Sequence, residues 1–406
     1  MTFQEKMLNV EPINLFDYKS EIPEFRLLEK CPQDRKWHAE GDVLIHTNMV
    51  LEEAYKLCQD IKNPNIRQNI YFGSLLHDFG KPQTTFSKKN GKVVAYGHEG
   101  VGVLRAREFL RKHFPQFNFA RREWILSLVE FHGHPKRMMN TGSKDEKFKK
   151  LSLDVNTLEV HHVEVADFTG RRGASHDGAL KVLDDFQALC QRMDIWDKYY
   201  NIPNSEKLSK LVYNIARWRI LFRQMDENDQ QMFDKLKKFD DKEPFGLVMT
   251  IGVPGIGKTT YIDKIYSHLP KVSMDEKRAE LGDIMDMSKN QKVFSMCQKE
   301  LADNMRAGVN CVWDATSISR KMRKGLIDIV RQHGGYVSMV YFDSPLEDAL
   351  ERNSKRDRQV PKEVIEDYHT RLQSPKPYEY DRLVVVGEES KFQSEVEHGK
   401  QKESIR

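Results

Sequence analysis

The sequence lacks any apolar run that approaches the roughly 18 residues of a membrane-spanning helix. Its first residues, MTFQEKMLNVEPINLFDY, contain no apolar core of the kind that defines a signal peptide. Cysteine is scarce, because the 406 residues include only five, an odd number with no CxxC pair. We therefore expect a soluble cytoplasmic protein with no disulfide framework and no membrane partner.

A strong charge of one sign is also missing. Lys and Arg total 65 against 61 Asp and Glu, which gives a net charge of +4. This balance argues against binding to long tracts of nucleic acid, which requires a broad basic surface, but it leaves room for a local basic groove. The length favours two domains over one, and a hydrophobic content of 39% is sufficient for a core in each.

The first half of the chain is predicted to be all-α. Prolines make residues 1–35 look irregular, whereas apolar residues recur at helical spacing from about 43 to 200. The exception is Asn90-Gly91, which lies between two short extended runs and indicates a β-hairpin. We assign residues 1–225 to this domain and residues 226–243 to a linker.

The second half, residues 244–388, alternates apolar runs with helical stretches. Candidate strands are FGLVMTI, VSMD, NCVWDAT, YVSMVYFD and RLVVV. This alternation predicts an α/β domain with a parallel sheet and right-handed crossovers. Residues 389–406 are polar and charged and are expected to form a mobile tail.

A phosphate-binding loop is predicted at residues 252–259, where GVPGIGKT fits G-x-x-x-x-G-K-[ST] between a strand and a helix. The glycines let backbone N–H groups surround phosphate oxygens, Lys258 reaches the β- and γ-phosphates, and the Thr259 hydroxyl helps to hold Mg²⁺. The expected site for ATP or another NTP with Mg²⁺ consists of Gly252, Pro254, Gly255, Gly257, Lys258, Thr259 and Thr260.

Charged residues downstream of the loop could catalyse the transfer of a phosphoryl group. Asp275 ends a candidate strand with Arg278 three residues later, so a carboxylate base and an acceptor-binding guanidinium would share one space. The alternative is a helix-start aspartate beside a solvated arginine. Arg352 and Arg356 have i,i+4 spacing and would close over the phosphoryl group from one helix face, unless that face is merely solvated. Asp314 ends another strand and would assist Mg²⁺ or the acceptor, or cap the helix near residue 317.

These residues resemble the phage-type 5′-hydroxyl polynucleotide kinase family over residues 245–386. The matching parts are GVPGIGKTT, the D-x-x-R pair, Asp-Ala-Thr at 314–316, and the arginine segment followed by Val360-Pro361. The resemblance implies that Asp275 is the general base toward a 5′-OH and that Arg278 binds the neighbouring phosphate. It also implies that Arg352 and Arg356 are lid residues over the donor.

A second set of residues in the first half suits a metal centre. An adjacent His-Asp pair with a distant His and a distant Asp supplies four N/O ligands for a divalent ion, which would lower the pKa of bound water for attack on phosphorus. The proposed ligands are His46, His77, Asp78 and Asp167, with Lys81 and Arg171 holding phosphate oxygens. The alternative is that each histidine is an ordinary capping or solvated side chain.

The string LLHDFGKP and the H…HD…D order resemble the HD-domain phosphohydrolase superfamily over residues 35–200. PQDRKWHAEGDVLIHT, GHE at 97–99 and ADFTGR at 166–171 also resemble the HD domain attached to bacterial tRNA nucleotidyltransferases. The resemblance implies that His98 and His132 serve a second metal or the substrate phosphate. For His38 and His134 a structural role is equally open.

The two halves together resemble the bifunctional HD-Pnk end-healing enzymes. The resemblance implies phosphorylation of 5′-OH ends and removal of 2′,3′-cyclic phosphate, 2′-phosphate or 3′-phosphate at RNA or DNA ends, followed by sealing by a separate ligase. A transition metal such as Mn, Ni or Co is expected in the histidine-rich site. A small-molecule kinase with a nucleotidase, a nucleotide-regulated HD hydrolase and a toxin-like kinase remain alternatives, and the oligomeric state is open.

Overall fold

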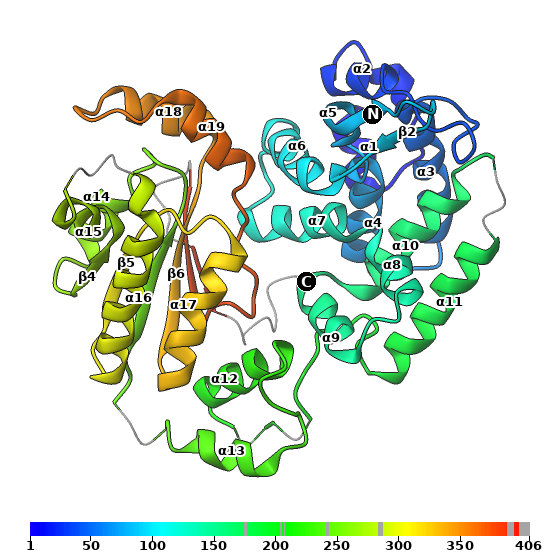
Figure 1. The fold of residues 1–406 in the computed structure, drawn as a ribbon. Helices are drawn as coiled ribbons and strands as arrows, with labels where there is room; N and C mark the ends of the chain where they lie inside the picture. The colour runs from blue at the N-terminus through cyan, green and yellow to red at the C-terminus, as the bar shows by residue number, and fades with distance from the viewer. Residues whose placement is uncertain are drawn as a thin grey trace. The chain divides into compact units, whose positions relative to one another are not determined.

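The computed structural model forms two compact units, Met1–Tyr200 and Asn201–Arg406 (Figure 1). It describes residues 1–173, 177–203, 205–206, 208–240, 243–282, 287–387 and 394–397. In this part of the chain no helix combines the length and the apolar character needed to cross a membrane.

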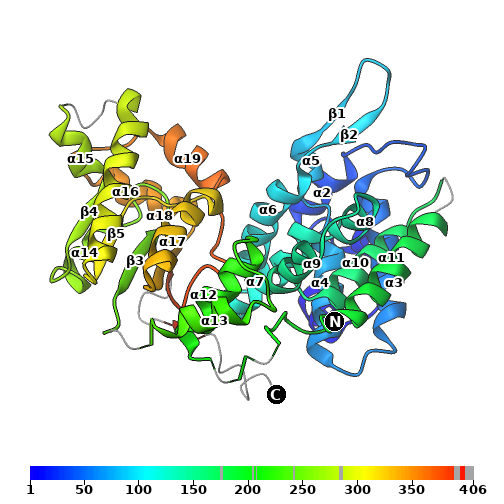
Figure 2. The same cartoon turned by 60° about the horizontal axis from the view of Figure 1, so that its bottom comes forward.

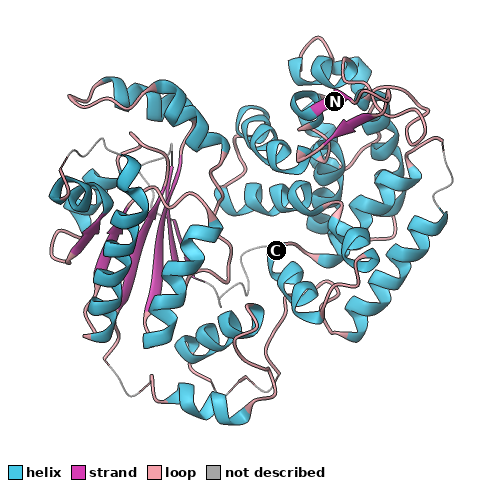
Figure 3. Cartoon of the chain, in the orientation of Figure 1, coloured by secondary structure: helices cyan, strands magenta, loops and turns pink. Residues whose placement is uncertain are grey.

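The first unit is helical with one hairpin, as predicted (Figure 3). Its helices are α1 (Phe3–Asn9), α2 (Pro23–Glu29), α3 (Val43–Cys58), α4 (Pro64–Leu76), α5 (Lys81–Thr84), α6 (His98–His113), α7 (Phe119–Phe131), α8 (His134–Asn140), α9 (Asp145–Asp154), α10 (Thr157–Thr169) and α11 (Asp177–Arg192), with a 3-10 turn at Leu15–Tyr18. Strands β1 (Thr85–Ser87) and β2 (Val93–Ala95) pair antiparallel.

The prediction that residues 1–35 are irregular is wrong. Thr2 and Glu5 form a capping box that starts α1, whose Phe3 and Met7 are buried. Pro23 occupies the first turn of α2, where its missing N–H has no cost, so this proline begins a helix and does not break one.

Close packing of α4 against α7 and α10 holds the centre of the first unit together. Gly73 of α4 is required there, because a Cβ at this position would lie 2.9 Å from Leu128 of α7 and 3.0 Å from Val163 of α10. Helix α3 packs on α4 and α10. The C-terminal ends of α4 and α7 therefore lie close to each other and to α10.

The second unit contains a parallel sheet, as predicted. Its elements are α12 (Lys210–Leu221), α13 (Gln230–Lys237), β3 (Gly246–Ile251), α14 (Lys258–Ile265), β4 (Lys271–Ser273), α15 (Met274–Glu280), a 3-10 turn at Met287–Lys289, α16 (Asn290–Arg306), β5 (Cys311–Asp314), α17 (Arg320–His333), β6 (Tyr336–Asp343), α18 (Leu346–Ser354), α19 (Lys362–Thr370), β7 (Arg382–Gly387) and β8 (Ser394–Glu397). The strand order is β4-β5-β3-β6-β7-β8, with five parallel strands and β8 antiparallel at the edge. Helices α16 and α17 lie side by side on one face of the sheet (Figure 1).

The C-terminal segment differs in part from the expected mobile tail, because residues 394–397 pair with β7 as an edge strand. The rest of that expected tail, residues 389–393 and 398–406, lies outside the described residues.

Helix α12 belongs to the second unit, although the sequence analysis assigned it to the first domain. Asn214 donates to Asp381 at 2.6 Å, and the Trp218 indole donates to Asp328 at 2.8 Å. Within the predicted linker, α13 buries Phe233 and Leu236. The break between the compact units, between residues 200 and 201, therefore precedes the predicted linker at residues 226–243.

Candidate active sites

Six predicted metal ligands converge in the first unit. Two of them cap helix ends, since His77 follows α4 and His132 follows α7, while His98 begins α6. His46 projects from α3 and Asp167 from α10. The helix packing described above therefore brings together residues that are up to 121 positions apart in the sequence.

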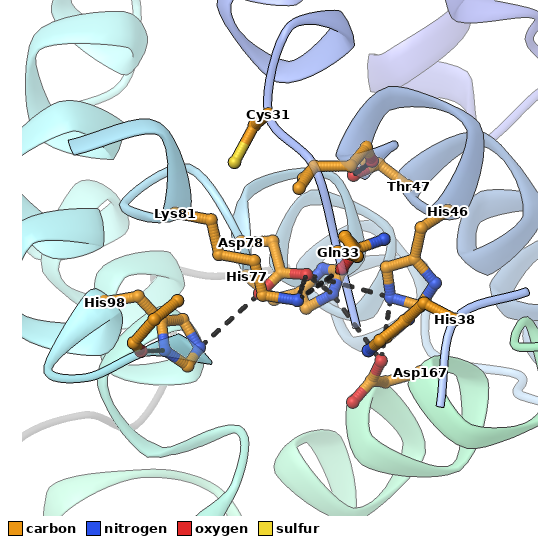
Figure 4. Close-up of polar contacts among 12 residues, drawn as sticks. Cys31, Gln33, His38, His46, Thr47, His77, Asp78, Lys81, His98 and Asp167 are labelled. Carbon is orange, nitrogen blue, oxygen red and sulfur yellow. Dashed lines mark hydrogen bonds and ion pairs between the residues drawn. The ribbon is translucent and has the colours of Figure 1, made fainter. Parts of the chain in front are cut away.

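The ligand atoms form two adjoining groups. In the first, His46 Nε2 lies 2.9 Å and His77 Nε2 lies 3.7 Å from Asp167 Oδ1 (Figure 4). The second joins Asp78, His98 and His132, and His98 Nε2 lies 3.5 Å from Asp78 Oδ1. Asp78 connects the groups, because its Oδ2 lies 3.1 Å from His77 Nε2.

Backbone carbonyls orient three of the histidine rings. The Nδ1 of His77, His98 and His132 lies 2.8–2.9 Å from the carbonyl oxygens of Ser74, Ala95 and Val129, respectively. An Nδ1–H donated to a carbonyl leaves Nε2 with a free lone pair, which is the form that binds metal. All three Nε2 atoms therefore present lone pairs to the centre.

A carboxylate orients the fourth ring. His46 Nδ1 lies 3.0 Å from Glu40 Oε1, and His38 Nδ1 lies 2.9 Å from the same oxygen. The Arg172 N–H donates to the other oxygen of Glu40 at 2.9 Å. This arrangement places His38 next to the centre, behind His46, and makes Glu40 a partner that the sequence analysis missed.

The electrostatics favour charged carboxylates and act in opposite directions on two of the imidazoles. At His77 burial acts to lower the pKa, but the carboxylates of Asp78 and Asp167 raise it overall. Burial acts to raise the pKa of Asp78, but His77 and Lys81 hold it well below its usual value. Burial also acts to raise the pKa of Asp167, but Arg171 and His46 hold this pKa well below its usual value. Burial, together with His77 and His98, lowers the pKa of His132 to about 3.

These residues fit a divalent metal ion. The Nε2 of His77 is buried and, although Asp78 Oδ2 lies 3.1 Å away, forms no hydrogen bond among the described residues, which is costly unless a ligand takes its lone pair. The donor set of imidazole nitrogens and carboxylate oxygens suits a borderline or hard divalent ion.

A cavity of about 410 Å³ opens onto the second ligand group. Lys81 and Arg171 line it, as their predicted phosphate-binding role requires. Lys81 Nζ lies 2.7 Å from Asp78 Oδ2, and Arg171 pairs with Asp167. The cations are thus held between the ligand carboxylates and the open space.

The cavity wall also contains residues that the sequence analysis missed. Lys136 and Arg137 of α8 line it, and Lys136 Nζ lies 4.5 Å from the centre of the Phe168 ring. Glu164 is buried in the same wall, and burial raises its pKa to about 8. His134, by contrast, contacts Arg137 and lies outside the ligand groups.

The phosphate loop of the second unit has the predicted form. Gly255 and Gly257 adopt φ values of +83° and +103°, which disfavour other residues. A Cβ at Gly255 would also lie 2.9 Å from the Ala349 carbonyl of α18. The loop ends at Gly257, the N-cap of α14, so the helix N-terminus faces the phosphate position.

Lys258 and Thr259 are held at the loop by polar contacts. Lys258 Nζ donates to the Val253 carbonyl at 2.7 Å, and the Thr259 hydroxyl donates to Asp314 Oδ2 at 3.1 Å. Burial lowers the pKa of Lys258 to about 8. Pro254 lies within the loop, and Thr260 in the first turn of α14 is exposed.

Asp314 therefore lies beside the Thr259 hydroxyl, which is predicted to hold Mg²⁺. The alternative role as a helix cap is wrong, because Ser319 caps α17.

Asp275 and Arg278 lie within one turn of α15. Asp275 follows the N-cap Ser273, so it sits in the first helical turn and not at the strand end itself. Arg278 Nη1 lies 2.5 Å from Asp275 Oδ1, and Arg278 also donates to Asn290 at 3.0 Å. The arginine is buried while the Asp275 side chain is 62% exposed, so the alternative of a solvated arginine is excluded.

The predicted shared helix face of Arg352 and Arg356 is wrong. Helix α18 ends at Ser354, and Arg356 lies in the following bend. Arg352 Nη1 donates to the Ile256 carbonyl of the phosphate loop at 2.8 Å. The charge of Arg356 acts on Lys258 and lowers its pKa, so both arginines still lie toward the loop.

Fold and geometry define a protein with two phosphate-handling domains, one with a candidate metal centre and one with a phosphate loop. A family model described as an HD domain matches residues 43–170, and AAA_33, described as an AAA domain, matches residues 247–375. The chain thus combines an HD hydrolase domain with a P-loop kinase-like domain.

Similarity to curated proteins is partial. The chain is 32% identical over 117 residues to the multifunctional CCA protein of Actinobacillus pleuropneumoniae serotype 5b (strain L20), which is 29% of this chain and 26% of that protein. It is 27% identical over 166 residues to the multifunctional CCA protein of Pasteurella multocida (strain Pm70), covering 37% and 36%. The chain therefore spans well under half the length of these relatives.

Similarity to solved structures is also limited. A chain of the Pnkp1/Rnl/Hen1 RNA repair complex matches with 23% identity and a TM-score of 0.30, covering 33% of this chain and 46% of that one. A gluconokinase from Sinorhizobium meliloti 1021 matches with 17% identity and a TM-score of 0.28, covering 36% and 84%.

Proposed function

We propose that the protein heals nucleic-acid ends, phosphorylating 5′-OH ends with an NTP and removing 2′,3′-cyclic phosphate, 2′-phosphate or 3′-phosphate at the other end. The observation that carries the proposal is the presence of two opposite phosphate chemistries in one chain. One is a cluster of six N/O ligands beside a cationic cavity, and the other is a phosphate loop followed by a carboxylate-arginine pair. RNA or DNA ends are the substrates, and a separate ligase seals them.

In the removal reaction, a divalent ion held by the two ligand groups would supply activated water and charge neutralisation. Lys81 and Arg171 hold the phosphate oxygens from the cavity wall, where both side chains are already placed. His77, His98 and His132 keep their Nε2 atoms directed at the centre through the carbonyl contacts of Nδ1. Mn, Ni or Co is the proposed ion.

In the addition reaction, backbone N–H groups of the loop and the start of α14 bind the nucleotide phosphates. Lys258 exchanges its contact with the Val253 carbonyl for the β- and γ-phosphates, while Thr259 and Asp314 hold Mg²⁺. Asp275 accepts the proton of the 5′-OH, and Arg278 binds the adjacent phosphate. Arg352 and Arg356 offset the charge that develops on the transferred group.

The test is incubation with labelled ATP and an oligonucleotide that carries 5′-OH and 2′,3′-cyclic phosphate ends, with both ends analysed. We expect label at the 5′ end and loss of the cyclic phosphate. Phosphate transfer only to the hydroxyl of a small molecule would indicate a small-molecule kinase and not end healing. Phosphate removal that depends on NTP, without any transfer of phosphate, would indicate a nucleotide-regulated hydrolase.

Because the two sites lie in different domains, each can be inactivated by a variant that serves as the control for the other. Lys258→Ala or Asp275→Ala should abolish 5′ transfer and leave 3′ clearance intact, whereas His77→Ala or Asp78→Ala should do the reverse. Near-normal transfer by Asp275→Ala would disprove the role of Asp275 as the base. Loss of both activities in a folded single-site variant would disprove independent sites.

A further inference from the structure

The β1–β2 hairpin carries an unusual set of exposed side chains. Phe86 is 51% exposed and Tyr96 is 64% exposed, and their rings form an edge-to-face pair with centres 6.1 Å apart. Exposed aromatic side chains on a hairpin contribute little to the core. A pair of them therefore forms a surface that is suited to stacking with flat ligands.

The same hairpin contains basic residues and no acidic residues. Residues 84–97 include Lys88, Lys89 and Lys92 and no Asp or Glu. This contrasts with the whole chain, in which acidic and basic residues nearly balance. The charge of the hairpin is complementary to a polyanion.

Lys88 lies close to the exposed Tyr96 ring. Its Nζ lies 2.6 Å from the tyrosine hydroxyl and 5.0 Å from the ring centre. A cation and an exposed aromatic side chain thus lie next to each other on the hairpin, which suits a base beside its backbone phosphate.

The hairpin is continuous with the metal centre. Ala95, the last residue of β2, accepts the Nδ1 contact of His98, which lines the cavity. Only Gly97 separates Tyr96 from this ligand, and the hairpin tip extends away from the helices of its own unit (Figure 2). A chain lying along the hairpin would thus lead to the cavity mouth.

From these observations we propose that the hairpin is an arm that binds a single-stranded nucleic acid and guides its 3′ end to the HD centre. The arm is defined as residues 84–97. Bases stack on Tyr96 and Phe86, and the three lysines contact backbone phosphates. This inference rests on the proposed function, and it specifies the substrate as a single-stranded end of several nucleotides and not a mononucleotide.

The experiment compares phosphate release from a single-stranded 8-mer that ends in 3′-phosphate with release from p-nitrophenyl phosphate. Tyr96→Ala should lower kcat/KM on the 8-mer at least about fivefold, because stacking on an aromatic side chain contributes substantially per base, and Tyr96→Trp should restore it. The activity on p-nitrophenyl phosphate should not change, since this compound is too small to reach the arm.

Charge is tested with Lys88→Gln, Lys89→Gln and Lys92→Gln combined. The matched control combines Lys62→Gln, Lys144→Gln and Lys147→Gln, three exposed lysines elsewhere in the unit with the same total charge. The arm variant should reduce the salt dependence of 8-mer binding, with a log–log slope shallower by about 2, and the control should not.

Several outcomes would contradict the proposed arm. In the activity assays, these are equal losses of kcat/KM on the 8-mer and on p-nitrophenyl phosphate, or an equal effect of the control lysines. In binding assays, they are no effect of any arm variant on 8-mer binding measured by fluorescence anisotropy, or arm-dependent binding to anionic phospholipid vesicles without any effect on the 8-mer. A wild-type protein that releases phosphate from neither compound contradicts the proposed removal function. Anisotropy with the same variants still decides the arm in that case.

Discussion

At the scale of single residues, Glu40 is the most informative new member of the HD centre. Its carboxylate lies 3.0 Å from His46 Nδ1 and orients the ring whose Nε2 lies beside Asp167. Burial acts to raise the pKa of Glu40, but His38, His46 and the Arg172 N–H lower it strongly, so the carboxylate is charged near neutral pH.

We predict that Glu40→Gln weakens metal affinity about 10- to 100-fold, as is typical when a carboxylate behind a metal-binding histidine is lost. Metal titration by calorimetry and phosphate release measure the effect. Glu53→Gln, on the helix that carries His46 and paired with Lys56 on the surface, serves as the control. Unchanged affinity in Glu40→Gln would show that His46 needs no such partner.

Lys258 gives a prediction about pH. Burial lowers its pKa to about 8 in the free loop, so above this pH the lysine loses the charge that attracts phosphate. Nucleotide binding must then take up a proton, and affinity should fall about tenfold between pH 7 and pH 9. Calorimetry in buffers of different ionisation enthalpy measures both the proton uptake and the nucleotide affinity. Lys258→Ala should bind weakly with no such pH dependence, and a flat profile in the wild type would contradict the assignment.

At the scale of elements, a buried ion pair ties α17 to the segment before β7. Arg323 Nε lies 2.9 Å from Glu379 Oε1, and both side chains are almost fully buried. The guanidinium also donates to the carbonyls of Ser317 and Gln373 at 3.0 Å. This pairing fixes the loop between α17 and β5, the strand that ends with Asp314 beside the phosphate loop.

We predict that Arg323→Met lowers the free energy of unfolding of the second unit by about 3–5 kcal/mol, because Glu379 would remain buried without its partner. Urea denaturation followed by kinase activity measures this change. Lys321→Met, an exposed position on the same helix, should have little effect. A double variant Arg323→Met with Glu379→Leu should recover much of the loss.

Elements with strong local patterns could be predicted from the sequence. Each of the five parallel strands overlaps one of the candidate strands in the sequence, and the phosphate loop has a fixed spacing. The end of α18 could not be predicted, because charged residues continue past it. There the Asn353 side chain bonds both the N–H and the carbonyl of Val360, at 2.9 and 2.8 Å, and folds the chain back.

The residues of the candidate metal site also fall into those that the sequence could reveal and those that it could not. His46, the His77-Asp78 pair and Asp167 could be found because they follow a familiar order. Glu40 and Glu164 could not, because their roles depend on which helices meet and not on local sequence. The signal for Glu40 was present in retrospect as a carboxylate between two histidines, His38 and His46.

At the scale of the whole molecule, the two centres should differ in metal requirement. We predict that chelation stops both reactions, that Mg²⁺ restores only the kinase reaction, and that Mn²⁺, Ni²⁺ or Co²⁺ restores phosphate release, because imidazole ligands favour transition metals. Parallel assays of both ends measure this. Full recovery of phosphate release with Mg²⁺ alone would contradict the assignment of the histidine-rich centre.

The contact between Arg352 and the Ile256 carbonyl links α18 to the phosphate loop before any nucleotide arrives. Because coupling between two events is reciprocal, any nucleotide that alters this contact also shifts the position of α18, and any force that holds α18 in place changes nucleotide affinity by the same factor. Release of the spent nucleotide is then coupled to this contact, which would make turnover sensitive to residues of α18 that never touch the phosphates.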